Sequence, residues 1–453
     1  MRLGHDRIHL VGAGGAGMSA IARVLIGMGH PVSGSDLRGG STLDLLGDFG
    51  VETYTGHHPG VVSTVDLVVA SSAVPDRDPE LVAAAAAGVP VWRRPRLLQD
   101  LTALMPTIGA TGTHGKTTTT ALIIAGLRAA GVDPSFIVGG DLADLGTNGH
   151  FGQDPLLVLE ADEAFRTFES LELVGLVVTN VESEHVEHFG SPVELLETFV
   201  AVASAVQGPV LACVDDSGAA QVAERTSAIT YGLDASATWR IRDFTPNQGG
   251  SRFMLSGPGA AQVEVHLRPP GLHNARNAAG ALGLLATLGY DLAACAEGLA
   301  GFHGVGRRWE HRGVVAGVTL IDDYAHHPTE VAATLSASVG VVPGRVWAVF
   351  QPHLYSRTER LQDEFGEALS AADVVVVTDV YGSREEPVPG VTGELVAQAV
   401  GRRGREVHYV AHKTDLARFL VDRVTQGDLV LTMGAGDITL LPTELAAMLA
   451  ESR

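Results

Sequence analysis

The chain has 453 residues, of which 52 are acidic and 31 basic, so its formal charge is −21. Such a charge repels phosphate backbones and anionic lipid, which argues against a nucleic-acid partner or a membrane-surface role. At roughly 100–200 residues per domain, the length predicts two to four domains. No apolar stretch approaches the ~18–20 residues of a membrane span, the N-terminus is polar, and two cysteines make no disulfide framework. We therefore expect a cytoplasmic protein, and nothing in the composition implies an obligate protein partner.

Short β-branched runs alternate with alanine-rich helical stretches along the whole chain. Continuous apolar strands between helices predict an α/β protein whose parallel sheets are covered on both faces. Breaks near Pro106 and Gly313 suggest three domains, at residues 1–105, 106–312 and 313–453. The clearest expected strands are Ile8–Val11, Leu67–Ala70, Leu156–Leu159, Gly175–Thr179, Val346–Phe350, Asp373–Thr378 and Leu429–Thr432.

The first expected domain opens with a dinucleotide-type fingerprint. After the strand Ile8–Val11, the segment Gly12–Gly17 has the spacing G-x-G-x-x-G, and a helix should begin near Met18. Asp36 follows a second expected strand at the distance of a ribose-binding acid. The glycines let the backbone approach a diphosphate, which then lies at the helix N-terminus. This pattern favours a diphosphate site over a packing turn, but it does not distinguish NAD from another nucleotide diphosphate.

The second expected domain opens with a loop of the P-loop type, Gly112–Thr118, although Ala110 stands where a standard P-loop has glycine. In such a loop the backbone N–H groups cradle phosphates, Lys116 would reach the β- and γ-phosphate oxygens, and Thr117 could bind Mg²⁺. Lys116 is one of only two lysines in the chain, so a purely structural turn explains it poorly. Two phosphate loops in one chain indicate two nucleotides, one hydrolysed and one carried.

Acidic residues follow the next two expected strands. Leu156–Leu159 leads into Glu160–Glu163, and a later strand leads into an acidic loop that contains His185. Magnesium prefers carboxylate oxygens, and strand carboxyl ends are where such groups project in α/β sheets. A histidine among acids is more often a solvated loop residue, but the position of His185 favours a metal ligand.

On these motifs the chain resembles the Mur ligase family, the ATP-dependent amide-forming enzymes of peptidoglycan precursor synthesis. The resemblance extends from Ile8 to Ile438, and the segments Asp322–Glu330 and Phe350–Thr358 match the alanine-adding branch most specifically. The other matching segments are Gly12–Met18, Ser71–Val74, Gly112–Thr118, Glu160–Glu163, Gly271–Asn277, Gly304–Glu310 and Gly434–Ile438.

The resemblance implies a Rossmann-like UDP-sugar domain, a central P-loop ATPase-like domain and a C-terminal Rossmann-like domain that completes the amino-acid and ATP sites. It implies ligation of L-alanine to the lactyl carboxylate of UDP-N-acetylmuramate through an acyl phosphate, with ATP and with Mg²⁺ or Mn²⁺. Three alternatives stay open: a tripeptide-recycling relative, an NAD-dependent oxidoreductase, and a non-catalytic nucleotide-binding regulator.

The resemblance also assigns roles to individual residues. The UDP-sugar would be held by Gly14, Gly15, Ala16, Gly17, Asp36, Ser71 and Ser72. ATP would be held by Gly112, Thr113, His114, Gly115, Lys116, Thr117, Thr118, Asn274, Asn277, Arg308 and Asp323. The implied metal ligands are Thr117, Glu163 and His185, and the implied amino-acid site is Tyr324, His326, His353 and Arg357. The implied catalytic set is Lys116, Glu163, His185, Arg308 and His326, where His326 is a candidate base by position only.

Two motifs depart from the usual pattern of the family. The acidic motif continues Ala164-Phe165 where the family has Ser-Asp, so a supporting acid is missing or supplied elsewhere. The histidine motif has Glu184 and Glu187 in place of two aspartates. No lysine lies between Lys116 and Lys413, so the carbamylated lysine of several related ligases is absent.

Overall fold

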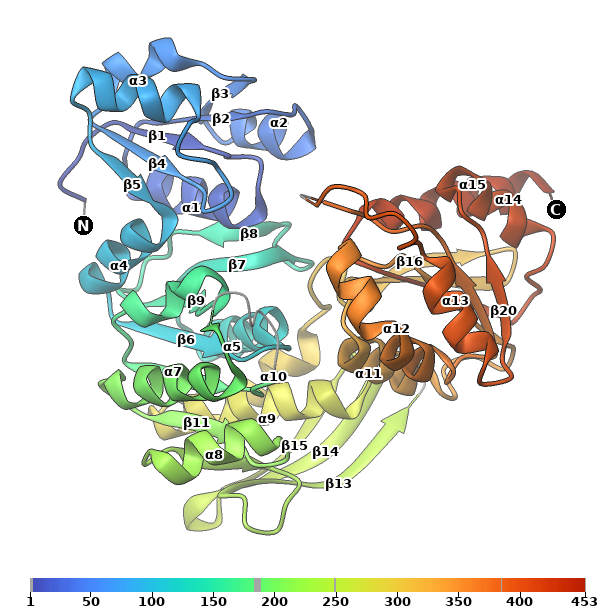
Figure 1. Ribbon diagram of the computed structural model, residues 1–453. Helices are drawn as coiled ribbons and strands as arrows, with labels where there is room; N and C mark the ends of the chain where they lie inside the picture. The colour runs from blue at the N-terminus through green and yellow to red at the C-terminus, as the bar shows by residue number, and fades with distance from the viewer. Residues whose placement is uncertain (1–2, 183–188, 248–249, 384, 453) are drawn as a thin grey trace. The chain divides into compact units, whose positions relative to one another are not determined.

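The computed structural model describes residues 3–182, 189–247, 250–383 and 385–452, which form three sheets with helices around them (Figure 1). The chain divides into two compact units. The first contains Met1–Phe244, Phe253–Leu267 and Ala275–His303, and the second contains Thr245–Arg252, Arg268–Asn274 and Gly304–Arg453. The α/β class and the three sheets are confirmed.

The first sheet has five parallel strands. Its strands are β1 (Ile8–Val11), β2 (Val32–Asp36), β3 (Glu52–Thr55), β4 (Leu67–Ala70) and β5 (Val91–Arg93). The helices are α1 (Ala16–Gly27), α2 (Ser41–Asp48), η1 (Pro59–Thr64), α3 (Pro79–Ala87) and α4 (Arg94–Leu104). The strand order is β3-β2-β1-β4-β5, so the direction of winding reverses between β1 and β4. In such sheets the ligand lies at the carboxyl ends of the two strands where the order reverses.

The second sheet has ten strands. They are β6 (Thr107–Thr111), β7 (Ser135–Leu142), β8 (Thr147–His150), β9 (Leu157–Glu160), β10 (Gly175–Val178), β11 (Val210–Cys213), β12 (Ile229–Gly232), β13 (Trp239–Asn247), β14 (Gly250–Ser256) and β15 (Gln262–Leu267). The helices are α5 (Lys116–Ala129), η2 (Ala164–Ser170), α7 (Pro192–Ala205), α8 (Ser217–Arg225), η3 (Pro258–Ala260), α9 (Leu272–Thr287) and α10 (Leu292–Gly301). Because β6 pairs in parallel with both β9 and β10, the carboxyl ends of these three strands meet at one edge.

The third sheet has six strands. They are β16 (Glu310–Val315), β17 (Val318–Asp323), β18 (Val346–Phe350), β19 (Val374–Val377), β20 (Glu406–Tyr409) and β21 (Leu429–Met433). The helices are α11 (Pro328–Ser338), α12 (Tyr355–Leu369), α13 (Glu394–Gly401), η4 (Lys413–Asp415), α14 (Leu416–Val421), η5 (Asp437–Leu440) and α15 (Leu441–Ser452). The order is β16-β17-β21-β18-β19-β20, and α11, α12 and α13 bury one face while α14 and α15 bury the other.

The expectation of purely parallel sheets is wrong for two strand pairs whose register the described residues establish. β7 pairs with β8, and β16 pairs with β17, in antiparallel register. Each pair is joined by a short turn, and a short turn can only connect antiparallel neighbours. Among the described residues, no helix has both the length and the apolar character needed to cross a bilayer.

Within the first unit, α1 packs against β8 (Figure 1). Gly149 of β8 is so close to α1 that an added Cβ would lie 2.3 Å from the carbonyl oxygen of Ala20. The buried side chain of Asn148 accepts a hydrogen bond from Arg23 and donates one to the carbonyl oxygen of Ala16, at 2.8 Å. The helix that begins at the first glycine-rich loop is therefore anchored to the second sheet.

Candidate active site

The first glycine-rich loop connects β1 to α1, as predicted from the sequence, and is held mainly by the end of β2. The N–H groups of Gly12 and Ala13 both donate to the carbonyl oxygen of Ser35, at 2.8 and 2.9 Å. The N–H of Gly14 donates to the Asp36 carboxylate at 3.0 Å. Gly12 has φ +83°, and an added Cβ would lie 3.1 Å from the Cβ of Ser71, so a glycine is required there.

Asp36 has a structural role that sequence reasoning did not foresee. Besides closing the loop through Gly14, its carboxylate accepts a hydrogen bond from the N–H of Arg38 at 3.2 Å. Its assignment to the UDP-sugar stays a prediction, as do those of the other predicted residues, Gly14, Gly15, Ala16, Gly17, Ser71 and Ser72.

A buried glutamate supports this loop indirectly, through Ser35. Glu80 is fully buried near the start of α3 and accepts hydrogen bonds from the Ser35 hydroxyl and the His58 N–H, both at 2.6 Å. Burial alone would raise the pKa of Glu80, but these hydrogen bonds and the neighbouring His9 hold it below its ordinary value. Sequence reasoning missed Glu80; its only local signal is a helix start of the form Asp-Pro-Glu at residues 78–80.

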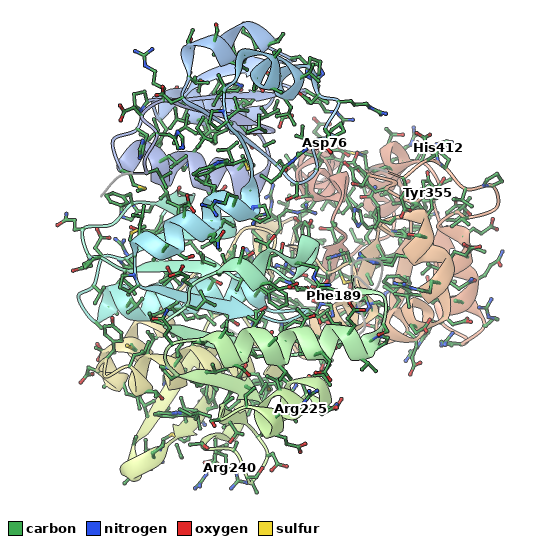
Figure 2. All side chains as sticks on the ribbon, turned by 60° about the vertical axis from the view of Figure 1, so that its left-hand side comes forward. Asp76, Phe189, Arg225, Arg240, Tyr355 and His412 are labelled. Carbon is green, nitrogen blue, oxygen red and sulfur yellow. The ribbon has the colours of Figure 1, made fainter. Side chains whose placement is uncertain are left out.

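Ser71 lies on the other side of the point where the strand order reverses, directly after β4. Its N–H donates to the carbonyl oxygen of Val11 at 3.0 Å, so it borders the loop that follows β1. Arg93 holds the Ser71 turn by donating to the carbonyl oxygens of Ser71 and Val74, at 3.3 and 2.7 Å. The Arg93 guanidinium also pairs with Asp76, an exposed carboxylate (Figure 2).

The second glycine-rich loop connects β6 to α5 and is held by the residues that follow β10. The N–H groups of Thr113 and His114 donate to the backbone and side-chain oxygens of Asn180, at 3.1 and 2.8 Å. The Thr179 hydroxyl donates to the carbonyl oxygen of His114 at 2.6 Å. An added Cβ at Gly112 would lie 2.1 Å from the Thr179 hydroxyl oxygen. Thr179 and Asn180 carry no motif of their own, which is why sequence reasoning did not assign them.

Lys116 is the first residue of α5, and its ammonium group is surrounded by oxygens. Nζ donates to the carbonyl oxygens of Gly112 and Thr113, at 2.8 and 3.2 Å, and to both carboxylate oxygens of Glu163, at 2.8 and 3.0 Å. The Asp162 carboxylate lies 3.8 Å away. Burial would lower the pKa of Lys116, but the two carboxylates outweigh it and raise this pKa above its ordinary value.

Glu163 is almost completely buried, and burial raises its pKa to about 7 although Lys116 opposes this shift. A buried carboxylate with a second carboxylate nearby suits a cation, and oxygen donors are the ligands that Mg²⁺ prefers. Thr117, on the first turn of α5, adds a half-buried hydroxyl. These residues fit the predicted metal site, whereas His185 lies outside the described residues.

The two predicted asparagines lie on α9. Asn277 contacts the second loop directly, because a Cβ added to Gly115 would lie 2.7 Å from the Asn277 side-chain oxygen. Asn274 is buried, and its side-chain amide donates to the carbonyl oxygen of Pro270 at 2.7 Å. Their assignment to ATP stays a prediction.

In the second unit, Arg308 and Asp323 lie together at the end of β17. The Asp323 carboxylate accepts hydrogen bonds from the N–H groups of Trp309 and Ala325, at 2.7 and 2.8 Å. Burial raises the pKa of Asp323 to about 6, with Arg308 acting in the opposite direction. The Arg308 guanidinium lies 5.1 Å from the centre of the Tyr324 ring. The role of both residues in ATP binding stays a prediction.

Three of the four residues predicted for the amino-acid site form one ring cluster at the carboxyl edge of the third sheet. The Tyr324 and His326 rings are 5.2 Å apart, and the His326 and His353 rings are 5.7 Å apart. His353 also stacks on Tyr381, which follows β19 and was not predicted. His326 Nδ1 lies 3.1 Å from the Glu330 carboxylate, another unpredicted partner. Arg357, the fourth predicted residue, is buried in the first turn of α12.

Family profiles match three successive parts of the chain. The Mur ligase family catalytic domain matches residues 7–105, the Mur ligase middle domain matches 110–285, and the Mur ligase glutamate ligase domain matches 307–436. The chain therefore belongs to the Mur ligase family. The domain boundaries expected at 105 and 312 stay predictions.

Curated relatives match over nearly the full length. The UDP-N-acetylmuramate–L-alanine ligase of Acidothermus cellulolyticus is 43% identical, covering 97% of this chain and 94% of the relative. That of Saccharopolyspora erythraea is 44% identical, covering 98% and 93%. Among solved structures, the UDP-N-acetylmuramate–alanine ligase of Thermotoga maritima superposes with a TM-score of 0.86 at 29% identity, covering 99% of this chain and 100% of that one. A murein peptide ligase of Psychrobacter arcticus, at 22% identity and a TM-score of 0.71, shares the fold.

Proposed function

We propose that the protein ligates L-alanine to the lactyl carboxylate of UDP-N-acetylmuramate, with conversion of ATP to ADP and phosphate. The product is UDP-N-acetylmuramoyl-L-alanine, a precursor of peptidoglycan. The observation that carries the proposal is the 43–44% identity over nearly the whole chain to ligases of this name. The Lys116–Glu163 site adds the charge arrangement that phosphoryl transfer requires. The two free cysteines, both buried, are compatible with the reducing cytoplasm in which we place the reaction.

The proposed chemistry begins with attack of the lactyl carboxylate on the γ-phosphorus of ATP, which forms an acyl phosphate and ADP. An anion attacks a polyanion in this step, so positive charge must lie close to the transferred group. Lys116 supplies that charge, because its raised pKa keeps it protonated at neutral pH. The amine of L-alanine then attacks the acyl carbon and displaces phosphate, leaving the amide.

The predicted metal would be held by Thr117, Glu163 and His185. When bound, Mg²⁺ or Mn²⁺ supplies further neutralisation of the phosphate oxygens. Asp162 is a candidate for the supporting acid that the Ala164-Phe165 departure removes, because its carboxylate lies 3.8 Å from Lys116 Nζ.

The proposed amine site is the ring cluster of Tyr324, His326 and His353, with Arg357 as the cation for the amino-acid carboxylate. The amine must lose a proton before or during attack, and His326 is the proposed base. The Glu330 carboxylate lies 3.1 Å from Nδ1 of His326, an arrangement that would orient the ring and leave Nε2 for the proton.

Phosphate release from ATP in the presence of UDP-N-acetylmuramate tests the proposal. We expect release with L-alanine, slower release with glycine and L-serine, and none with the recycled tripeptide, because a pocket that fits the alanine side chain would reject larger amines. One methylene is worth only about 1–3 kcal/mol in such a pocket, so glycine should be weaker rather than inactive. Faster turnover with the tripeptide would assign the chain to the recycling branch. Absence of release with every amine would favour the non-catalytic alternative, and reduction of NAD would favour the oxidoreductase.

A further inference from the structure

The last glycine of the first loop lies against an arginine that no motif includes. A Cβ added to Gly17 would lie 3.0 Å from Cζ of Arg94, 3.1 Å from Nη1 and 3.3 Å from Nε. Three guanidinium atoms at nearly equal distance mean that the face of this group rests on Gly17. Gly17 belongs to the first turn of α1, the helix end at which a bound phosphate is expected.

The position of Arg94 is determined by its surroundings. It is the first residue of α4, and Pro95 follows it, a residue well suited to a first helical turn. Arg93, directly before it, is tied to the Ser71 turn by two hydrogen bonds. Arg93 is the last residue of β5 and Arg94 follows it, so both arginines lie at the same sheet edge as the first loop.

The two arginines differ in what their charges contact. Arg93 is occupied by the carbonyl oxygens of Ser71 and Val74 and by Asp76. For Arg94, the described part of the chain provides no hydrogen bond, ion pair or ring contact to the guanidinium, and Nε is buried without a partner. A buried N–H without an acceptor is costly, and a bound anion would remove that cost.

The first loop also needs a cation from outside itself. It contains no lysine or arginine, and the Asp36 carboxylate, which holds Gly14, adds negative charge beside the diphosphate position. The whole chain carries a formal charge of −21, so the general field does not attract a diphosphate. A guanidinium at the loop can bind two phosphate oxygens at once.

We propose that Arg94 binds the diphosphate of the UDP-sugar and that residue 17 is glycine to make room for the Arg94 guanidinium. This inference rests on the proposed function, which supplies the UDP-sugar as the ligand. It gives the third glycine of the fingerprint a reason other than helix–strand packing.

Isothermal titration calorimetry tests the proposal with UDP-N-acetylmuramate and UMP as probes. Charge-assisted hydrogen bonds to phosphate predict that Arg94→Ala weakens UDP-N-acetylmuramate binding about 10–100-fold. Arg94→Lys should recover part of this loss, because lysine keeps the charge but not the planar group. Gly17→Ala should also weaken binding, since its Cβ displaces the guanidinium. UMP has one phosphate, so its affinity should fall less than that of the UDP-sugar, a difference that a purely structural role would not produce.

Arg96→Ala is the matched control. Arg96 is an exposed neighbour on α4 that pairs with Asp100, so its loss removes the same charge without a contact to the loop. We expect less than a twofold change in the Kd for UDP-N-acetylmuramate, and unchanged ATP binding in all variants.

The outcomes separate this inference from the proposed function. An unchanged Kd for UDP-N-acetylmuramate in folded Arg94→Ala, or equal losses for UMP and the UDP-sugar, would overturn the role of Arg94 and leave the ligase activity standing. Wild-type protein that binds the UDP-sugar without ligating L-alanine would overturn the proposed function. The change in Kd between wild type and Arg94→Ala, compared for the UDP-sugar and UMP, would still decide the role of Arg94. Wild-type protein that binds no UDP-sugar would overturn both.

Discussion

The two glycine-rich loops share a strand–loop–helix arrangement but differ in how their charges are organised. In the first loop, the Gly12 and Ala13 amides donate to Ser35 and the Gly14 amide donates to Asp36. The cation that lies against this loop, Arg94, comes from another part of the chain. The second loop carries its own cation in Lys116, which is paired with a buried carboxylate. The first arrangement suits a ligand that is held unchanged, and the second suits a phosphate whose charge changes during reaction.

The buried glutamates beside the two loops show the same contrast. Glu80 is satisfied by N–H and O–H donors, and its pKa lies below the ordinary value. Glu163 is buried against Lys116, and its pKa is raised to about 7. Ionisation of Glu80 therefore stabilises the folded state, whereas ionisation of Glu163 costs stability as the pH rises from its ordinary pKa toward 7. A carboxylate that is costly to ionise gains more from a bound cation than one that is already satisfied.

Lys116→Ala should have the largest effect on activity. It removes the cation of the second loop and leaves the first loop unchanged. We expect turnover to fall by about 10²–10³ or more, because a charge contact to the transferred phosphoryl group is lost. Binding of UDP-N-acetylmuramate, measured by calorimetry, should be unchanged. Arg128→Ala, which removes one positive charge from the exposed end of the same helix, should retain activity. Loss of UDP-sugar binding in folded Lys116→Ala would show that the two sites are not independent.

Glu163→Gln should raise the metal requirement. With one predicted ligand neutralised, we expect the half-saturating Mg²⁺ concentration for phosphate release to increase at least about tenfold. Glu160→Gln removes the same charge from the end of β9, where the carboxylate accepts the Gly139 N–H, and should change this concentration much less. An unchanged magnesium titration for Glu163→Gln would remove this residue from the metal site. His185→Ala tests the predicted histidine ligand in the same assay.

Gly12→Ala and Gly112→Ala, which change the first glycine of each loop, compare how closely the two loops are packed. Both glycines have positive φ, which costs an alanine about 1–3 kcal/mol. At Gly112 the new Cβ would also lie 2.1 Å from the Thr179 hydroxyl oxygen, whereas at Gly12 the nearest atom is 3.1 Å away. Gly112→Ala should therefore weaken ATP binding more than Gly12→Ala weakens UDP-sugar binding. Equal losses would mean that the clash at Gly112 is relieved by local movement.

Glu80→Gln should have the smallest effect, a pH-dependent loss of stability. The folded-state pKa of Glu80 lies below 4.5, so its stabilisation is present above that pH and is lost as the pH falls through the folded pKa. Thermal unfolding at pH 7.5 should show a lower Tm for the variant, consistent with a loss of about 1–3 kcal/mol. The difference from wild type should shrink as the pH falls below 4.5. A constant difference across this range would show that charge is not the cause.

Sequence alone determined the bounds of the seven strands predicted above to within one residue, and it determined the positions of the two glycine-rich loops. Ile8–Val11, Leu67–Ala70 and Val346–Phe350 have the predicted bounds, because each is a mainly apolar run followed by glycine or by polar residues. Leu156–Leu159 differs from the observed strand, Leu157–Glu160, by one residue, since a polar residue can end a buried strand. The role of Lys116 was predicted from its place in the glycine-rich loop, and that of Glu163 from the resemblance to the Mur ligase family.

Only the tertiary structure decided which isolated polar residues support these motifs. The Arg94 guanidinium lies against Gly17, and Glu80 accepts the hydrogen bond of the Ser35 hydroxyl. The Asn180 carbonyl oxygen accepts the hydrogen bond of the Thr113 N–H. The two residues of each pair are far apart in the sequence. Nothing in the local pattern distinguishes Arg94 from Arg93, although one is occupied by carbonyl oxygens and the other faces the loop. Such contacts follow from the strand order, which brings the carboxyl ends of distant strands to one edge, and a single sequence does not encode that order in any local pattern.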